Sequence, residues 1–182
     1  GRGGAQQAVR VQPAQALTDR RISALARGAD GVLWIGTRNG LNRYNPRGGA
    51  LLQVHAGAGP EHLAAGFVSA LLLDRAGRLW VGTYGGGLHR LEGTGKVPRW
   101  QRIGRAEGLP DDNVNALVED NEGRIWASTE DGLAVVDPAD LRARALRRAE
   151  GVVFLSYWTG AATRTPAGEL LFGASGDRKS VV

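Results

Sequence analysis

The sequence predicts an all-β fold, and three observations carry this prediction. A segment of seven residues centred on a tryptophan aligns without gaps around Trp34, Trp80 and Trp126. A fourth copy places Leu171 in the tryptophan position, and successive copies lie 46, 46 and 45 residues apart. The 182 residues also include 28 glycines, about twice the usual share, which favours many tight turns. Such a period with four strands per unit is typical of a β-propeller, so we expect a β-propeller fragment of about four four-stranded blades, part of a larger propeller.

The second unit shows best how one blade divides into four strands. Residues 68–74 form an apolar run that suits an innermost, buried strand. Residues 78–83 include aromatic and β-branched side chains, which favour a second strand. Three glycines at 85–87 supply the positive φ angles of a tight hairpin, and residues 88–92 and 100–103 follow as the third and outer strands.

The same hairpin position carries turn signals in the neighbouring units. Asn39-Gly40 in the first unit and Asp131-Gly132 in the third are dipeptides that favour a two-residue hairpin. We therefore place one partial propeller at residues 1–176, with repeat units at about 17–63, 64–108, 109–150 and 151–176.

The recurring tryptophan has a structural interpretation. It returns at one place in each unit, and large apolar side chains in such places pack between neighbouring repeats. We therefore expect Trp34, Trp80, Trp126 and Leu171 to pack between blades rather than to stack on a ligand.

The motifs around the tryptophans resemble a known repeat. Residues 33–44 (LWIGTRNGLNRY), 79–88 (LWVGTYGGGL) and 108–114 (GLPDDNV) look like the two-component regulator propeller repeat, and the resemblance extends over residues 17–176. That family forms the periplasmic sensor region of hybrid histidine kinases and of some membrane-bound diguanylate cyclases. The resemblance implies a periplasmic sensor for a small molecule, with carbohydrate as the expected class. It also implies a homodimer formed through the parent protein, and membrane contact only through parent domains outside this segment.

The C-terminal part of the chain departs from the repeat. Residues 154–173 resemble the final blade of such propellers, which would place this chain at the C-terminal end of a larger propeller. Residues 177–182 interrupt a unit that should continue with a third strand, and we interpret them as a non-native tail. An open arc of blades leaves two apolar flanks uncovered, so we expect the isolated chain to self-associate.

Composition and motifs argue against several other classes of protein. The formal charge of +5 comes mainly from arginines scattered along the chain, which disfavours a nucleic-acid surface. There is no cysteine, so disulfides and thiolate metal sites are excluded, and the longest apolar stretch, residues 64–73, is too short to span a membrane. The three histidines form no HExxH pair and the glycines form no nucleotide-binding motif. We therefore expect no metal, no cofactor and no catalytic residue in this segment.

Ligand binding is better supported, by loops at one end of the predicted blades. The position after the repeated threonine holds Arg38, Tyr84 and Glu130 in successive units, while the framework around it repeats. Variation on a constant scaffold is expected where loops carry function, although unconstrained surface is the alternative. We predict that these three residues act as a charge clamp, a stacking platform and a hydroxyl acceptor, respectively. The full predicted ligand-binding set is Arg38, Asn39, Tyr84, Asp112, Glu130 and Asp131.

These observations predict the ligand-sensing, extracytoplasmic propeller of a two-component receptor whose kinase or cyclase domain lies outside this segment. Two alternatives stay open. A propeller enzyme such as a lyase or glycosidase would need converging acids or histidines, for which His89 is the one inviting candidate. A protein-interaction scaffold would show an apolar patch on the loop face rather than a polar pocket.

Overall fold

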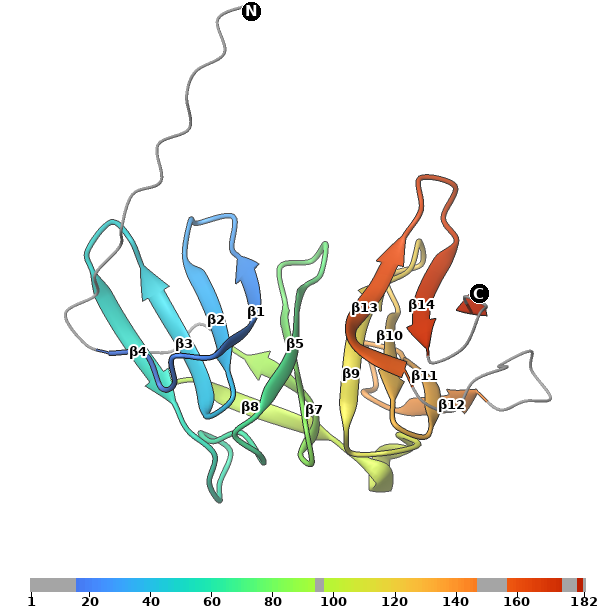
Figure 1. Ribbon diagram of the computed structural model, residues 1–182, viewed down its shortest axis with the longest axis horizontal. Coiled ribbons are helices and arrows are strands. Elements are labelled where there is room, and N and C mark those ends of the chain that lie inside the picture. Colours follow the sequence, from blue (N-terminus) through green and yellow to red (C-terminus); the bar gives the residue numbers. More distant parts are fainter. Residues whose placement is uncertain (1–15, 94–96, 147–156, 175–179, 182) are drawn as a thin grey trace, which may run out of the picture.

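The described part of the protein is a series of antiparallel sheets. The computed structural model describes residues 16–93, 97–146, 157–174 and 180–181. Their regular structure is all β except for one short 3-10 turn, η1 (Arg105–Glu107). Four sheets follow one another, and within each sheet the strands lie in sequence order (Figure 1). The predicted all-β propeller fragment is therefore confirmed.

Three sheets have four strands and the fourth has three described strands. The first blade contains β1 (Ile22–Arg27), β2 (Leu33–Thr37), β3 (Gly40–Asn45) and β4 (Ala50–Val54). The second contains β5 (Val68–Leu73), β6 (Leu79–Thr83), β7 (Gly87–Glu92) and β8 (Arg99–Ile103). The third contains β9 (Val114–Glu119), β10 (Ile125–Thr129), β11 (Gly132–Val136) and β12 (Ala143–Leu146). The fourth contains β13 (Tyr157–Arg164), β14 (Leu170–Ala174) and β15 (Ser180–Val181).

The first strand of each blade lies innermost, and these inner strands contact one another in turn. The pairing register skips one residue in the inner strand, at Ser23 in β1 and Ser69 in β5. Such a bulge re-aims a side chain. Here the Ser23 and Ser69 hydroxyls donate to the carbonyls of Val68 and Val114 in the next blade, both at 2.5 Å. These two hydrogen bonds therefore tie β1 to β5 and β5 to β9.

Close approach of the blades explains the glycine that follows the tryptophan by two positions. A Cβ on Gly36 would lie 2.5 Å from Val68 Cγ1, and a Cβ on Gly82 would lie 2.7 Å from Val114 Cγ1. Real Cβ atoms do not approach other atoms this closely, so a side chain at either position would push the next blade away.

The apolar core lies between blades, at three interfaces that we call the first, second and third seams. Trp34 of β2 packs in the first seam, Trp80 of β6 in the second and Trp126 of β10 in the third. In the second seam, Trp80 is fully buried with Val114 and Ile125 of the third blade. Each tryptophan therefore contacts the blade that follows it.

The two outer flanks of this arc differ from the seams. Leu71 and Leu117 pack in the first and second seams, whereas Leu25, the equivalent residue of the first blade, is 66% exposed. On the fourth blade, Leu171 is half-buried and Trp158 is 64% exposed. Leu171 therefore lies in the tryptophan position of a blade with no following seam among the described residues.

The interpretation of residues 177–182 as a non-native tail stays a prediction. Within that segment, Ser180–Val181 pairs with β14 as the third strand of its sheet.

A buried carboxylate supports the tryptophan in the second blade. Asp74 Oδ2 accepts from Trp80 Nε1 at 2.8 Å and from Arg78 Nε at 2.6 Å, while its Oδ1 accepts from the Arg78 amide at 2.8 Å. Burial raises the pKa of Asp74, but the hydrogen bonds from Trp80 and Arg78 outweigh it, so the pKa lies below its ordinary value. We call this arrangement the carboxylate lock.

The third blade repeats the carboxylate lock. Asp120 Oδ2 accepts from Trp126 Nε1 at 2.8 Å and from Arg124 Nε at 2.7 Å. The pKa of Asp120 is likewise lowered, because these hydrogen bonds outweigh its burial. Across the second seam, Arg75 of the second blade adds an ion pair to Glu119 of the third at 3.1 Å.

Candidate functional site

Loops from two places in each blade meet at one end of the inner strands, which we call the loop face. One kind precedes the inner strand and the other joins the second and third strands. The Arg38 amide donates to the Arg21 carbonyl at 3.2 Å, and the Tyr84 amide donates to the Phe67 carbonyl at 2.9 Å. Glu130 repeats the contact with the carbonyl of Asn113 at 3.2 Å. Because the backbone of this position is held the same way in three blades, its side chain can vary without changing the scaffold.

The three variable side chains are linked into one row that crosses three blades. The Arg38 guanidinium carbon lies 5.5 Å from the centroid of the Phe67 ring. Phe67 stacks on Tyr84 with ring centroids 5.5 Å apart and an interplanar angle of 24°. The Tyr84 hydroxyl donates to Glu130 Oε1, which also accepts from Asn115 Nδ2 at 3.3 Å. We call the row of Arg38, Phe67, Tyr84 and Glu130 the loop-face ladder.

Glu130 sets the protonation state of Tyr84 at the polar end of the loop-face ladder. The hydrogen bond to Glu130, together with burial, raises the pKa of Tyr84 to about 12. The phenol therefore stays neutral and donates a proton to the carboxylate at physiological pH. Asn115, in the bulge position of β9, is fully buried, and its Oδ1 has no hydrogen-bond partner within the described residues. This leaves an acceptor beside the Tyr84–Glu130 pair.

Two further residues of the predicted set lie on the same loops but outside the ladder. Asn39 and Asp131 are exposed, and the amide of each donates to the threonine hydroxyl of its own hairpin, Thr37 at 3.1 Å and Thr129 at 3.2 Å. These contacts shape the hairpin turn and leave both side chains at the surface.

Asp112 holds backbone rather than extending the ladder. Its carbonyl accepts from the amides of Gly85 and Gly87, at 3.2 and 2.8 Å. Its carboxylate forms an ion pair with Arg102 at 3.2 Å and accepts from the Arg105 amide at 3.2 Å. Asp112 therefore links the glycine hairpin of the second blade to the start of the third.

Sequence reasoning missed Phe67, the residue at the centre of the ladder. A signal was present, because Arg21, Phe67 and Asn113 lie 46 residues apart and precede the inner strands of three successive units. The position varies in the same way as Arg38, Tyr84 and Glu130.

His89, the candidate for an enzyme, is buried in β7. Its exposed fraction is 1%, and Nε2 accepts from the Ala64 amide at 3.0 Å. Burial lowers the pKa of His89 to about 4. Its position therefore supports the segment between the first two blades and does not present the imidazole to solvent.

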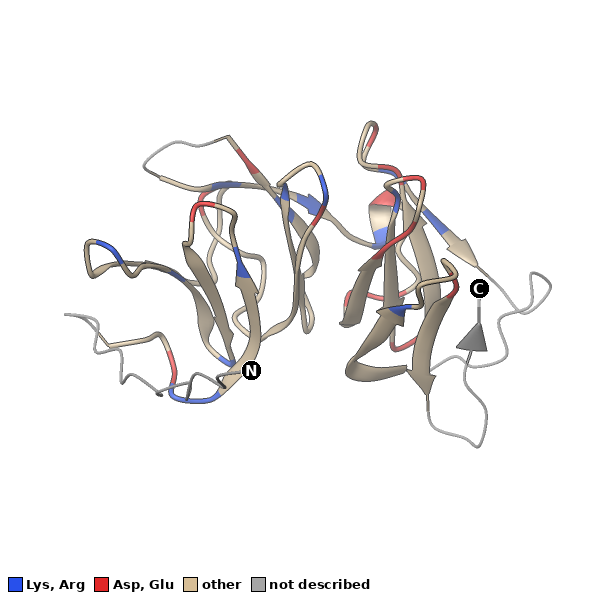
Figure 2. Ribbon diagram, turned by 90° about the horizontal axis from the view of Figure 1, so that it is seen from above, with Lys and Arg blue, Asp and Glu red and all other residues tan. Residues whose placement is uncertain are grey.

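The described residues also bear on metal binding and membrane insertion. No group of three or more His, Cys, Asp or Glu side chains there could hold a metal ion. Nor does that part of the chain contain a helix long and apolar enough to cross a membrane. Acidic and basic residues are interspersed over the blades (Figure 2).

Three segments match the profile of the two component regulator propeller family, at residues 16–39, 62–85 and 108–131. Each matched segment runs from the loop before an inner strand to the hairpin that carries Arg38, Tyr84 or Glu130. These three segments are repeats of this family. No curated protein sequence matches the propeller significantly.

Solved structures show the same fold in longer proteins. The propeller is 25% identical, with a TM-score of 0.74, to the extracellular domain of a B. thetaiotaomicron protein described as the hybrid two component system BT3049. A second extracellular domain from B. thetaiotaomicron, of the system BT4673, is 21% identical with a TM-score of 0.71. The alignments cover 88% and 91% of this chain but 21% and 23% of those chains, so the propeller spans about a fifth of their length.

Propeller enzymes share the fold at lower identity. The virginiamycin B lyase of Staphylococcus aureus is 15% identical with a TM-score of 0.64, and the alignment covers 90% of this chain and 56% of the lyase. Likeness at this level shows the architecture alone.

Proposed function

We propose that this two-component regulator propeller segment is the ligand-sensing, extracytoplasmic part of a receptor and binds its ligand at the loop-face ladder. The observation that carries the proposal is the continuous row from Arg38 through Phe67 and Tyr84 to Glu130. It joins three blades on a shared face and is built from positions that vary while the framework repeats. The three repeats of this family and the extracellular domains of similar fold support a periplasmic sensor.

The chemistry of the ladder suits a carbohydrate. Aromatic rings offer apolar surface to the faces of sugar rings, and a few placed polar groups then fix orientation. Arg38 is exposed and donates only, whereas the Glu130 carboxylate accepts. A sugar that presents hydroxyl donors toward Glu130 and acceptors toward Arg38 meets both ends of the row.

Signalling follows from differential affinity for two states of the parent receptor. A ligand that bridges blades binds more tightly to one arrangement of the propeller, and so shifts the population of two dimer arrangements of the parent. The output domain, a histidine kinase or a diguanylate cyclase, then reports that shift. In this proposal the segment contributes binding and no catalytic step.

The test is a calorimetric titration of the chain with a panel of neutral and uronate-containing oligosaccharides. We expect Tyr84→Ala and Arg38→Ala to weaken binding by about tenfold each, because each removes a stacking face or a charged donor. Arg99→Ala on the outer strand β8 is the matched control and should leave the affinity unchanged. Full binding by both ladder variants would remove the proposed site, and no binding of any saccharide would remove the proposed ligand class.

Neither alternative function is favoured by a specific observation. The lyase-like fold is shared at low identity, and His89 is buried against the Ala64 amide rather than facing a ligand. The loop face carries a charged and aromatic row rather than an apolar patch, which argues against a purely protein-binding surface.

A further inference from the structure

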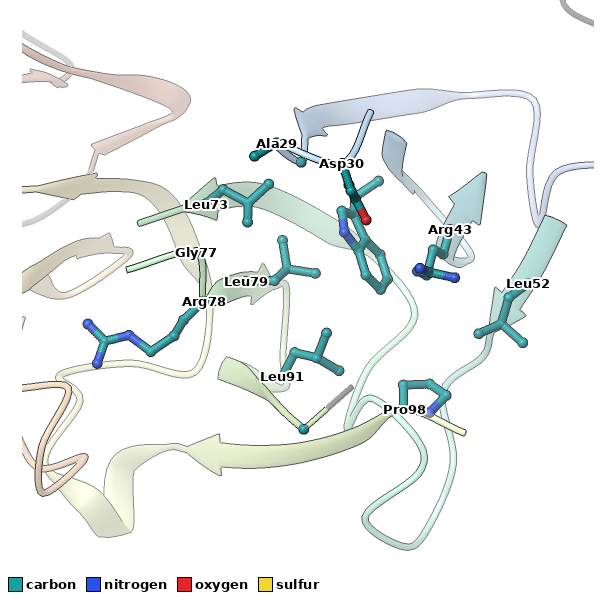
Figure 3. A pocket seen from close by; sticks show the side chains of 13 residues that line it. Ala29, Asp30, Arg43, Leu52, Leu73, Gly77, Arg78, Leu79, Leu91 and Pro98 are labelled. Atoms are coloured by element: carbon teal, nitrogen blue, oxygen red, sulfur yellow. The ribbon is translucent and has the colours of Figure 1, made fainter. Parts of the chain in front are cut away.

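A second candidate site lies at the other end of the blades from the loop-face ladder. A cavity of about 680 Å³ opens in the first seam, beside the turn that joins β1 and β2. This volume falls within the range of small-molecule sites. Leu73, Leu79 and Leu91 of the second blade supply an apolar wall, and Arg43 and Leu52 of the first blade lie across from them (Figure 3).

The cavity occurs where the carboxylate lock is missing. Gly28 stands at the position of Asp74 and Asp120, and Val32 stands at the position of Arg78 and Arg124. Trp34 lines the cavity, and within the described residues its Nε1–H has no hydrogen-bond partner. Trp80 and Trp126 instead donate to their aspartates at 2.8 Å. The first seam therefore contains an indole N–H without a protein acceptor among the described residues. The equivalent N–H groups of the next two blades each have an aspartate acceptor within their own blade.

A second donor in the cavity is also left open. The Arg43 guanidinium carbon lies 5.8 Å from the Trp34 ring centroid, and among the described residues Arg43 has no ion pair or side-chain hydrogen bond. Its counterpart Arg90 covers Trp80 in the same way, at 5.9 Å, but also donates to the Pro138 carbonyl at 2.8 Å and to Gln101. Arg43, which is exposed, and Trp34 thus both line the cavity with donors that no described protein group occupies.

We propose that this cavity binds an organic acid with an apolar body, whose carboxylate is held by the Arg43 guanidinium and the Trp34 indole N–H. An arginine fork and a neighbouring N–H match the two oxygens of a carboxylate. The bound carboxylate accepts from the Trp34 N–H, as Asp74 and Asp120 accept from Trp80 and Trp126 in the next two blades. The apolar body lies on Leu73, Leu79 and Leu91.

Two other charged groups at the cavity, Arg78 and Asp30, limit the charge of the ligand. Arg78 Nε already donates to Asp74 at 2.6 Å, so the negative charge of Asp74 offsets part of the positive potential that Arg78 adds. Asp30 is exposed at the β1–β2 turn, and its Oδ1 accepts from the Val32 amide at 3.0 Å. Its negative charge disfavours ligands with a second carboxylate near the turn. Monocarboxylates are therefore the expected class.

The test uses the full chain and three probe acids: phenylacetate, indole-3-acetate and octanoate. Binding is followed in nuclear magnetic resonance spectra by the indole N–H signal of Trp34, assigned with Trp34→Phe. We expect at least one acid to shift this signal saturably at millimolar concentration, and its uncharged amide to leave it unmoved. Absence of a shift with all three acids, or equal shifts with the amides, overturns the proposal.

Variants separate this site from nonspecific attraction to a basic protein. Arg43→Gln should weaken binding of the responsive acid by about tenfold, the loss expected for one charge-assisted contact. Arg90→Gln, the same change in the second seam, should leave the affinity unchanged. Equal losses in both variants would show that net charge alone attracts the acid. Because Arg38 and Tyr84 are not involved, Tyr84→Ala should not affect acid binding, which keeps this result independent of the loop-face ladder.

Discussion

The first and second seams each bury the repeated tryptophan, Trp34 and Trp80 respectively, between two blades. The side chains that surround the tryptophan differ between the two seams. In the second seam, Asp74 fixes Trp80 and Arg78, while Arg75 crosses to Glu119 of the next blade. In the first seam, glycine and alanine occupy the positions of Asp74 and Arg75, and a cavity of about 680 Å³ takes the place of these contacts. Apolar burial, with the Ser23–Val68 hydrogen bond, therefore holds the first two blades together without the carboxylate lock. We infer that the carboxylate lock is what distinguishes the closed second seam from the first.

The largest difference between the seams should appear when the lock is removed. Asp74→Ala leaves the buried Trp80 Nε1 without its acceptor and the partly exposed Arg78 without its ion-pair partner, so we expect a loss of about 3 kcal/mol in the free energy of unfolding. Asp30→Ala, at the equivalent turn of the first blade, removes one exposed acceptor and should cost less than about 1 kcal/mol. Urea denaturation followed by tryptophan fluorescence measures both. Equal, small losses would contradict the distinction between the seams.

As the pH falls, the first seam should lose its contribution to the free energy of unfolding before the second seam does. The pKa of His89 is about 4 in the folded chain against an ordinary value of 6.5, so the unfolded chain binds the proton first as pH falls. Stability from this group is complete above pH 6.5 and is lost as pH falls to about 4, by about 3 kcal/mol. Asp74 and Asp120 have lowered pKa values, so their contribution is lost only below the ordinary carboxyl value of 3.8.

Denaturation at a series of pH values tests this order. His89→Gln, which keeps an acceptor for the Ala64 amide, should flatten the dependence between pH 6.5 and 4. An unchanged slope in that variant would show that His89 is not the group responsible.

Copying the lock into the first blade should close the first seam. The triple change Gly28→Asp, Asp30→Ala and Val32→Arg gives the first turn the residues of the second at these positions. Asp30 must change because a Cβ on Gly28 would lie 2.5 Å from Asp30 Oδ1. We expect a gain of about 1 kcal/mol in the free energy of unfolding, because hydrogen bonds form but Val32 loses its apolar burial. Organic-acid binding should disappear in this variant, and binding that persists would contradict the assigned carboxylate position.

The smallest effect is expected on the loop face. Tyr84→Phe keeps the stack on Phe67 but removes the hydrogen bond to Glu130, which should cost about 1 kcal/mol. Spectroscopic titration of the phenol should find the pKa of Tyr84 near 12 in the native chain and closer to 10 in Glu130→Gln. Because the folded pKa is raised, this contribution is complete below pH 10 and is lost as pH rises through about 12. A pKa that does not move in Glu130→Gln would show that the carboxylate is not its cause.

Repetition explains what could be predicted from the sequence. The tryptophan period located the blades, because a residue that returns every 46 positions marks a contact that every blade makes. The same comparison indicated that Arg38, Tyr84 and Glu130 occupy equivalent loops. Phe67 was missed, although its own period is as regular, because an aromatic residue before an apolar strand resembles core.

Side-chain partners were harder to predict than positions. The place of Asp112 at the ligand site stays a prediction, and the sequence did not show that its carbonyl and carboxylate hold the glycine hairpin and Arg102. The cavity depends on three-dimensional packing in the first seam, which the sequence does not show. Its cause was nevertheless visible, since Gly28 breaks the series that Asp74 and Asp120 continue.

Hydrogen exchange of the tryptophan indole N–H groups tests the difference between the seams most directly. Trp34 and Trp126 are each 6% exposed, so burial alone predicts equal protection for these two. If the carboxylate lock is what distinguishes them, the Trp34 N–H should exchange at least about tenfold faster than those of Trp80 and Trp126 in one spectrum series. Exchange of Trp34 as slow as that of Trp126 would contradict an open donor in the first seam.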